Sequence, residues 1–302
     1  MAIQQERLDR RVSNLKLAGV LQPGEPSPFK LKSSFRFLRE NCPDIEGFLD
    51  FLYRPDFLPL VSLTVDLHKD EKRKATDDPY MKHILLATYY VYKGMQKERL
   101  TDSQKRVILG GSLLHDYIEI KQKEDVEYND NDLHKKLSGV GIDQLEANEI
   151  FLVARLDTPK PKPDSMPGKE RIKIKREDFD RIMNITPSDV FENYGVTFPL
   201  IEAPYMDYTD AELLSRYIKE IKIADMAAIL KETYEDMLTN SDGNNIESRN
   251  DLRPLRERII VFQERLDMLK NIVGEHPLFF SMKMDLSYMA SILAIHDMGL
   301  YV

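Results

Sequence analysis

Apolar residues along most of this chain recur at every third or fourth position rather than at alternate positions. Clear examples are Ile221, Ala224 and Ala228 and, later, Ile259, Phe262, Leu266 and Leu269. This spacing gathers apolar side chains on one face of an α-helix, whereas strict alternation is typical of a strand. We therefore predict an all-α protein, and since no repeated motif is visible we do not expect a helical repeat array.

The same periodicity, together with capping residues and prolines, indicates where the helices lie. We expect a core of helices at Pro79 to Lys93, Asp102 to Lys121, Gln144 to Arg155 and Asp210 to Leu238. Short helices are expected around Phe35 to Arg39 and Ile45 to Tyr53, and longer ones near 254–273 and 283–298.

Changes in composition suggest three parts. Residues 1–60 form an N-terminal helical extension packed on the core, 61–240 a central domain, and 241–302 a C-terminal helical extension. Within the central domain, residues 157–204 begin with the proline-rich, basic stretch TPKPKPDSMPGKERIKIKR. Because this segment is too long for an ordinary helix connection, we expect a lid, an inserted subdomain or a mobile, solvated loop.

Charge and cysteine content narrow the class of protein. The net charge is −8, and nucleic-acid polymers and anionic membranes are bound by positive surfaces, so neither partner is expected. The single cysteine, Cys42, has no partner for a disulfide, which fits a reducing compartment and a partly buried thiol. With no long apolar run and a charged start, the chain is expected to be cytoplasmic.

His83 is the first candidate for chemistry. It follows Asp78 and Pro79, which suit the N-cap and first position of a helix. It shares a helix face with the apolar positions Ala87 and Val91. A hydrogen-bonded core histidine has the same pattern, so His83 alone does not establish a site.

The second candidate is the pair His115 and Asp116 in VILGGSLLHDYIE. Gly110, Gly111 and Ser112 would let another helix approach closely one turn before the pair. An imidazole beside a carboxylate supplies the nitrogen and oxygen ligands that suit Mn, Fe, Ni or Zn better than Ca. A His-Asp dipeptide also arises by chance, so it needs further support.

Asp225 supplies that support, because it interrupts the apolar stripe Ile218, Ile221, Ala228. A carboxylate on a buried face is costly unless it is paired or binds a metal. A buried salt bridge or a half-exposed edge position are the alternatives.

The order His, His-Asp, Asp on separate helices resembles the HD superfamily of metal-dependent phosphohydrolases. More narrowly, LHKDEKRKATDDPYMKHILLA, SLLHDYIE and IKIADMAAI resemble three motifs of the RelA/SpoT-like alarmone hydrolases. The resemblance covers roughly residues 65–235 and implies an HD-domain helical core.

The resemblance also implies roles for individual residues. His83, His115, Asp116 and Asp225 would hold one ion, Mn2+ first among the divalent transition metals. Glu119 would act on the attacking water beside Asp116, and Arg73 or Lys74 would contact the nucleotide. The implied reaction is hydrolysis of a phosphoester or pyrophosphate in a nucleotide, most specifically removal of the 3'-pyrophosphate from ppGpp or pppGpp.

Three departures from the family pattern weaken the prediction of which nucleotide is the substrate. Ile120 stands where the family has a second acid, and Met226 and Ile229 replace an arginine and an asparagine. Arg73 lies ten residues before His83 rather than nine. Three alternatives therefore stay open: an HD nucleotidase or dinucleotide phosphatase, a catalytically impaired regulatory nucleotide-binding protein, and a helical interaction protein. The sequence determines neither the metal nor the oligomeric state.

Overall fold

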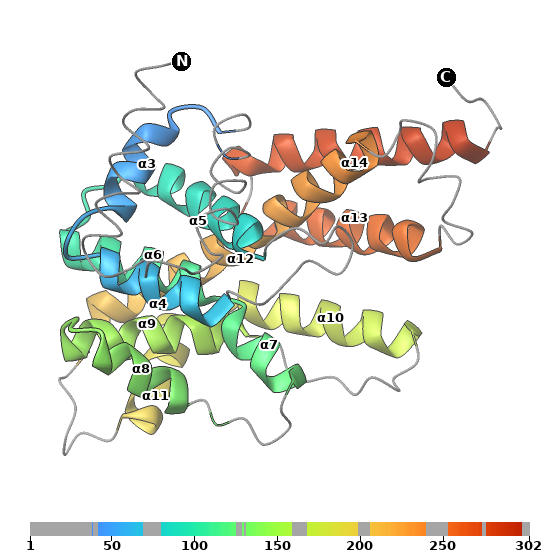
Figure 1. Ribbon diagram of the computed structural model, residues 1–302. Coiled ribbons are helices and arrows are strands. Elements are labelled where there is room, and N and C mark those ends of the chain that lie inside the picture. Colours follow the sequence, from blue (N-terminus) through green and yellow to red (C-terminus); the bar gives the residue numbers. More distant parts are fainter. Residues whose placement is uncertain are drawn as a thin grey trace, which may run out of the picture.

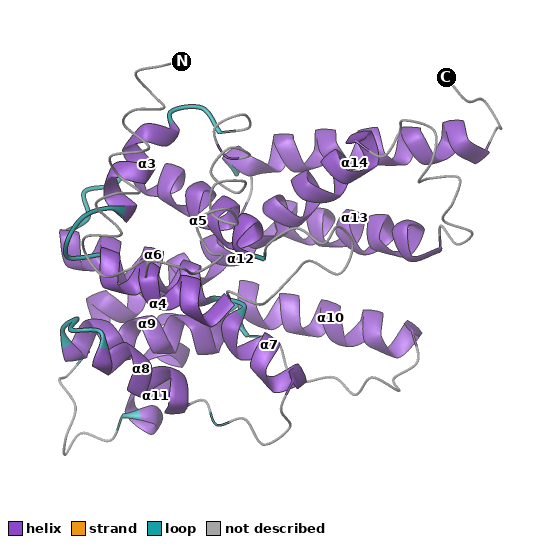
Figure 2. Cartoon of the chain, viewed as in Figure 1, coloured by secondary structure: helices purple, strands orange, loops and turns teal. Residues whose placement is uncertain are grey.

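The computed structural model describes residues 38, 42–68, 80–124, 129, 131–158, 168–198, 206–239, 253–273 and 276–297. Within these ranges every regular element is a helix (Figure 2), which confirms the all-α prediction. The helices are α3 (Ile45–Leu52), α4 (Leu58–His68), α5 (Met81–Met95), α6 (Asp102–Leu114), α7 (Tyr117–Glu124), α8 (Asn131–Gly139), α9 (Gln144–Asp157), α10 (Gly168–Met183), α11 (Pro187–Thr197), α12 (Tyr208–Thr239), α13 (Arg253–Val273) and α14 (Pro277–Asp297).

Helix α12 is the central element, and it packs against α5, α9, α11 and α14. Figure 1 shows α13 and α14, in orange and red, on the side of the molecule opposite to α8 and α11. Since neighbours cover α12 on several sides, it is apolar around much of its circumference. Ile221 and Ala228 enter one hydrophobic cluster, whereas Met226 and Leu230 enter another.

These two clusters divide the helices between them. The larger cluster joins α3 to α9, α11, part of α12 and Ile182 of α10, and the smaller joins α10, α12, α13 and α14. Helix α14 therefore packs directly on the helix that carries Asp225, and α13 packs on α14 and α10. The predicted boundaries near residues 60 and 240 stay predictions.

Two glycines in α6 allow the close approach that the sequence suggests. A Cβ atom on Gly110 would lie 2.6 Å from the side chain of Leu60, and one on Gly111 would lie 2.3 Å from that of Val153. Both distances are well inside van der Waals contact, so larger residues would push α4 and α9 away from α6. This packing fixes α6 one turn before His115.

The predicted helix from Asp102 to Lys121 is wrong in one respect, because it is two helices. Helix α6 ends at Leu114 and α7 begins at Tyr117, so His115 and Asp116 form the junction. The apolar pattern continues across the junction since both helices bury residues there, Leu114 and Tyr117 among them. Periodicity therefore did not reveal the break.

The part of 157–204 that the structure describes is helical, so the expectation of a mobile loop is wrong there, while the lid and the inserted subdomain stay predictions. Residues 168–183 and 187–197 are the helices α10 and α11. Thr186 accepts a hydrogen bond from the backbone of Asp189 and forms a capping box around Pro187, a standard helix start. Helices α4 and α8 were likewise not predicted.

Candidate metal centre

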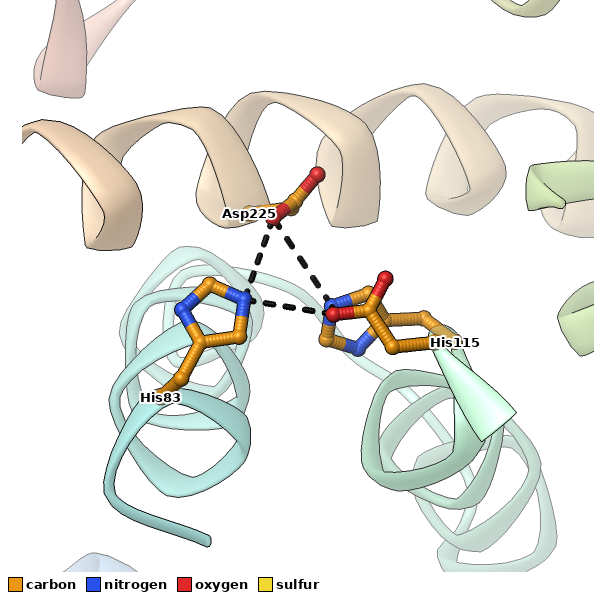
Figure 3. Close-up of side chains that lie close together, drawn as sticks. His83, His115 and Asp225 are labelled. Carbon is orange, nitrogen blue, oxygen red and sulfur yellow. Dashed lines mark ion pairs between the residues drawn. The ribbon is translucent and has the colours of Figure 1, made fainter. Parts of the chain in front are cut away.

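Four predicted side chains meet at the point where α5, the α6–α7 junction and α12 converge. His83, His115, Asp116 and Asp225 each offer one ligand atom, and these atoms all lie within 4.8 Å of one another. Figure 3 shows His83, His115 and Asp225 pointing toward one another from three separate helical segments. Residues separated by more than a hundred positions are thus brought together as the sequence suggested.

The outer ring nitrogen of each histidine faces an oxygen atom, through a hydrogen bond in His115 and an ion-pair contact without a hydrogen bond in His83. His115 Nδ1 lies 2.6 Å from the carbonyl oxygen of Ser112 and donates to it. His83 Nδ1 lies 3.3 Å from a carboxylate oxygen of Glu232. Both contacts favour a proton on Nδ1, which leaves the Nε2 lone pair directed inward, as in metal-binding histidines.

The inward atoms themselves lack hydrogen-bond partners among the described residues. Nε2 of His83, Nε2 of His115 and Oδ1 of Asp225 are buried and unsatisfied. Buried polar atoms are nearly always hydrogen-bonded, so three unsatisfied atoms facing one point require an explanation. A cation at that point supplies one.

The distances between these atoms fit a shared ion. Ligands about 2.0 to 2.2 Å from one metal at ordinary coordination angles lie about 3.0 to 3.4 Å apart. His83 Nε2 lies 3.2 Å from Asp225 Oδ1 and 3.4 Å from Asp116 Oδ2, and His115 Nε2 lies 3.3 Å from Asp116 Oδ2. The separation of His115 Nε2 from Asp225 Oδ1 is longer, 3.8 Å, and all four ligand atoms lie within 4.8 Å of one another. The geometry is compatible with a metal site.

Hydrogen bonds to the carboxylates hold them in place. The Tyr80 hydroxyl donates to Asp116 Oδ2 at 2.6 Å. The Lys222 ammonium donates to Asp225 Oδ2 at 3.0 Å, which leaves Oδ1 of that carboxylate for the centre. Lys222 also lies 3.6 Å from Asp157 at the end of α9. These contacts form an outer layer of the kind that orients metal ligands.

The electrostatics of the cluster favour positive charge at its middle. Burial by itself lowers the pKa of His83, but Glu232, Asp116 and Asp225 outweigh it and raise that pKa to about 10. The pKa of His115 is likewise raised, against burial, by Asp116 and Asp225. The pKa values of both aspartates lie well below the usual range, since the histidines and Lys222 outweigh burial. Without a metal, protons bound to the histidines supply the positive charge.

Four residues near the centre were not singled out from the sequence as parts of it: Tyr80, Asp157, Lys222 and Glu232. A signal existed for two of them, because Lys222 and Glu232 lie three residues before and seven after Asp225 and therefore share its helix face. Asp157 is 1% exposed and neither of its oxygens has a hydrogen bond among the described residues. Burial raises the pKa of Asp157 to about 6, although Lys222 opposes the shift.

Glu119 is not among the ligand atoms that converge. It lies in the first turn of α7 and is half-buried, and it interacts electrostatically with Lys222 and Arg265. The expectation that it follows His115 on one continuous helix is wrong, because the helix breaks between them. Its predicted catalytic role stays a prediction.

The predicted nucleotide contacts Arg73 and Lys74 lie outside the described residues, as do Asp78 and Pro79. Met226 is buried and Ile229 partly buried, and both pack in the smaller cluster with α13 and α14. These two departures from the family pattern therefore coincide with the packing of the C-terminal helices. Ile120 is half-exposed on α7.

Cys42 and the basic residues after residue 157 were also noted in the sequence, and packing or ion pairs account for those that the structure describes. Cys42 is buried, and burial with the nearby Glu235 raises the pKa of its thiol to about 12, so the thiolate form is scarce. Two of the basic residues expected in a mobile loop, Lys173 and Arg176, lie on α10. They pair with Glu177 and Glu264.

Comparison of the chain with protein-family models, curated proteins and solved structures found no match. The family resemblance therefore rests on the motifs in the sequence. No helix in the described part of the chain has the length and apolar character needed to cross a membrane.

Proposed function

We propose that this chain is a divalent-metal phosphohydrolase of the HD type that acts on a nucleotide. The observation that carries the proposal is the set of unsatisfied inward atoms on His83, His115 and Asp225, contributed by three helices in the HD order. A chance resemblance in sequence gives no reason for these side chains to converge.

The residues present suit a transition metal better than calcium. Two imidazole nitrogens with two carboxylates form a mixed nitrogen and oxygen set, and neutral imidazole is a good ligand for Mn, Fe, Ni and Zn. Mn2+ is our first candidate, on the strength of the family resemblance. When bound, such an ion acidifies water and stabilises negative charge on phosphoryl oxygens.

The surrounding side chains have complementary tasks in this proposal. Glu232 and the Ser112 carbonyl hold the two histidines in the ligand tautomer, while Tyr80 and Lys222 fix the orientation of the two aspartates. Asp116 or the nearby Glu119 accepts a proton from the attacking water. Water then displaces an alcohol or phosphate from the phosphorus atom, so one P–O bond forms and another breaks.

The finer proposal is removal of the 3'-pyrophosphate from ppGpp or pppGpp. It rests on the three motifs, whereas the packing of Met226 and Ile229 removes two expected nucleotide contacts. Hydrolysis of another nucleotide or dinucleotide by the same metal residues is therefore the main alternative.

The experiment combines metal analysis with a substrate panel. The protein is stripped with a chelator, reloaded with Mn2+ and analysed by mass spectrometry for metal content. Release of phosphate or pyrophosphate is then measured with ppGpp, nucleoside mono-, di- and triphosphates and dinucleoside polyphosphates. We expect one ion per chain and turnover that depends on it, both lost in His115→Ala.

Each contrary result selects another hypothesis. A chain that takes up no metal is a helical protein whose buried histidines and aspartates form an ion-pair cluster. Metal uptake with tight nucleotide binding and no turnover indicates a regulatory nucleotide-binding protein. Turnover of a different nucleotide keeps the phosphohydrolase proposal and replaces only the substrate.

A further inference from the structure

Arg265 is a partly buried cation on α13, outside the region that resembles the HD family. Its Nε atom is buried and has no hydrogen-bond partner among the described residues. The guanidinium lies over two aromatic rings, 5.4 Å from the centre of Phe179 and 5.7 Å from that of Phe262. Such contacts stabilise a guanidinium and fix its plane without using its donors.

Arg265 lies within electrostatic range of the candidate metal centre. Phe179 and Phe262 belong to the cluster that also contains Met226, the residue after Asp225. Asp225, Glu119 and Asp178 interact electrostatically with the guanidinium and partly oppose the lowering of its pKa by burial. No ion pair joins Arg265 to a carboxylate within the described ranges.

Neighbouring basic side chains differ from Arg265 because their donors are engaged. Lys222 contacts Asp157 and Asp225, and Arg176 pairs with Glu264. Arg181 has an unsatisfied Nε like that of Arg265, but its two terminal nitrogens donate to the carbonyl oxygens of Leu156 and Thr158. In Arg265 the buried Nε has no partner and no ion pair offsets the charge, which is costly unless a ligand brings negative charge.

We propose that Arg265 binds the phosphoryl group of the substrate, so that a C-terminal helix completes the site. The inference rests on the proposed phosphohydrolase function. Arginine forms paired hydrogen bonds with two oxygens of one phosphate, and the stacked rings hold its planar fork ready to do so. The chain is acidic overall, and Arg265 supplies the local positive charge that an anionic substrate needs.

A structural role for Arg265 is the competing explanation. In that case the guanidinium offsets the negative charge of Asp225, Glu119 and Asp178, and its removal lowers stability without changing anion affinity. The two roles therefore differ in the binding of a small phosphate.

The test measures binding of inorganic phosphate to the Mn2+-loaded full chain by titration calorimetry. Arg265→Gln removes the charge, and Arg265→Met removes it while keeping an apolar stem on the two rings. Arg256→Gln is the matched control, because Arg256 is an exposed arginine on the same helix. Metal content and thermal unfolding are measured for every variant.

We expect both Arg265 variants to bind phosphate at least tenfold more weakly with unchanged metal content, and Arg256→Gln to stay within twofold of the parent. Phosphate affinity within twofold in a folded Arg265 variant, or no phosphate binding by the metal-loaded parent, overturns the inference and leaves the metal site intact. Failure of the parent to load a metal refutes the proposed function itself, so the two failures are distinguishable.

Discussion

Two clusters of polar side chains in this protein contain histidines, and they differ in whether the histidine nitrogens have hydrogen-bond partners. At one end of α8 and α9, His134 Nε2 lies 2.7 Å from Asn148 Oδ1. Asn148 donates in turn to the Tyr194 hydroxyl at 3.1 Å and accepts from Gln144 at 2.8 Å. At the candidate metal centre, by contrast, the inward atoms of His83 and His115 have no such partners.

The contrast shows that a histidine in a polar cluster is a weak signal until its hydrogen bonds are counted. His134 is only half-buried and its Nε2 has a hydrogen-bond partner in Asn148, so packing and stability explain this network. In the His83 and His115 cluster, Nε2 of both histidines and Oδ1 of Asp225 have no hydrogen-bond partner and face one another. Of the outer nitrogens, Nδ1 of His115 donates to the Ser112 carbonyl, and Nδ1 of His83 has only an ion-pair contact with Glu232. A metal site is indicated where several buried polar atoms without hydrogen-bond partners face the same point.

The largest expected effect is loss of the metal from the candidate centre. His115→Ala removes a ligand and leaves Asp116 and Asp225 facing each other without it. We expect metal content to fall below about a tenth of an ion per chain and turnover to fall at least about a thousandfold, since an ion contributes several kcal/mol to catalysis. His134→Ala is the control, and metal loss there would remove the distinction between the clusters.

A smaller effect is expected from the outer contact of His83. Glu232→Gln keeps the size of the side chain but removes the carboxylate that holds Nδ1, and such changes weaken metal binding by about 10- to 100-fold. Competition with a chelating dye measures the affinity. Glu149→Gln is the control, because it is the same substitution at a buried glutamate of α9, and we expect it to leave the metal affinity unchanged. Equal affinity in both variants would show that Glu232 does not orient His83.

A third prediction concerns how metal affinity depends on pH. Because the pKa of His83 is raised to about 10 in the metal-free protein, protons compete with the metal below that pH. Metal affinity should rise as the pH increases from 6 to 9, by about tenfold per unit for each proton released. A flat profile would show that the histidines are not the ligands.

The stability of the metal-free protein should have the opposite pH dependence. A folded pKa of about 10 against about 6.5 in the unfolded chain means that protonated His83 stabilises the fold below pH 6.5. That contribution is lost as the pH rises from 6.5 toward 10. Chemical unfolding of the chelator-treated protein, compared with His83→Gln, measures this difference between pH 6 and 9.

The smallest effect on metal affinity is expected from a substitution in the His134 network. Asn148→Ala leaves the Tyr194 hydroxyl and the His134 ring without their buried partner, which should cost about 1 to 3 kcal/mol of unfolding free energy. Metal affinity should be unchanged within about twofold. Reduced metal binding at unchanged stability would show that the two clusters are coupled through α9.

The local pattern of the sequence was sufficient for the helical class and for the faces of the ligand helices. The apolar positions beside His83 and Asp225, among them Ala87, Val91, Ile221 and Ala228, are buried as predicted. Gly110 and Gly111 correctly indicated a close helix contact, because only glycine leaves room for the side chains of Leu60 and Val153. Such features depend on the spacing of neighbouring residues, which the sequence displays directly.

Helix boundaries were less well predicted. The junction at His115 and Asp116 was missed because apolar residues continue through it, and α10 and α11 were missed because the prolines before them suggested a loop. The local capping box at Thr186 and Pro187 does mark the start of α11, but the surrounding prolines were given more weight.

By itself the sequence determined that this is an all-α chain in which His83, His115, Asp116 and Asp225 are candidate ligands. Only the tertiary structure decided that these residues converge, that Glu232, Lys222 and Tyr80 contact them, and that Arg265 on α13 interacts electrostatically with Asp225. The physical reason is that unsatisfied atoms and contacts between helices depend on distances in space. Helical spacing specifies the face on which a side chain lies, but not which face of another helix lies opposite.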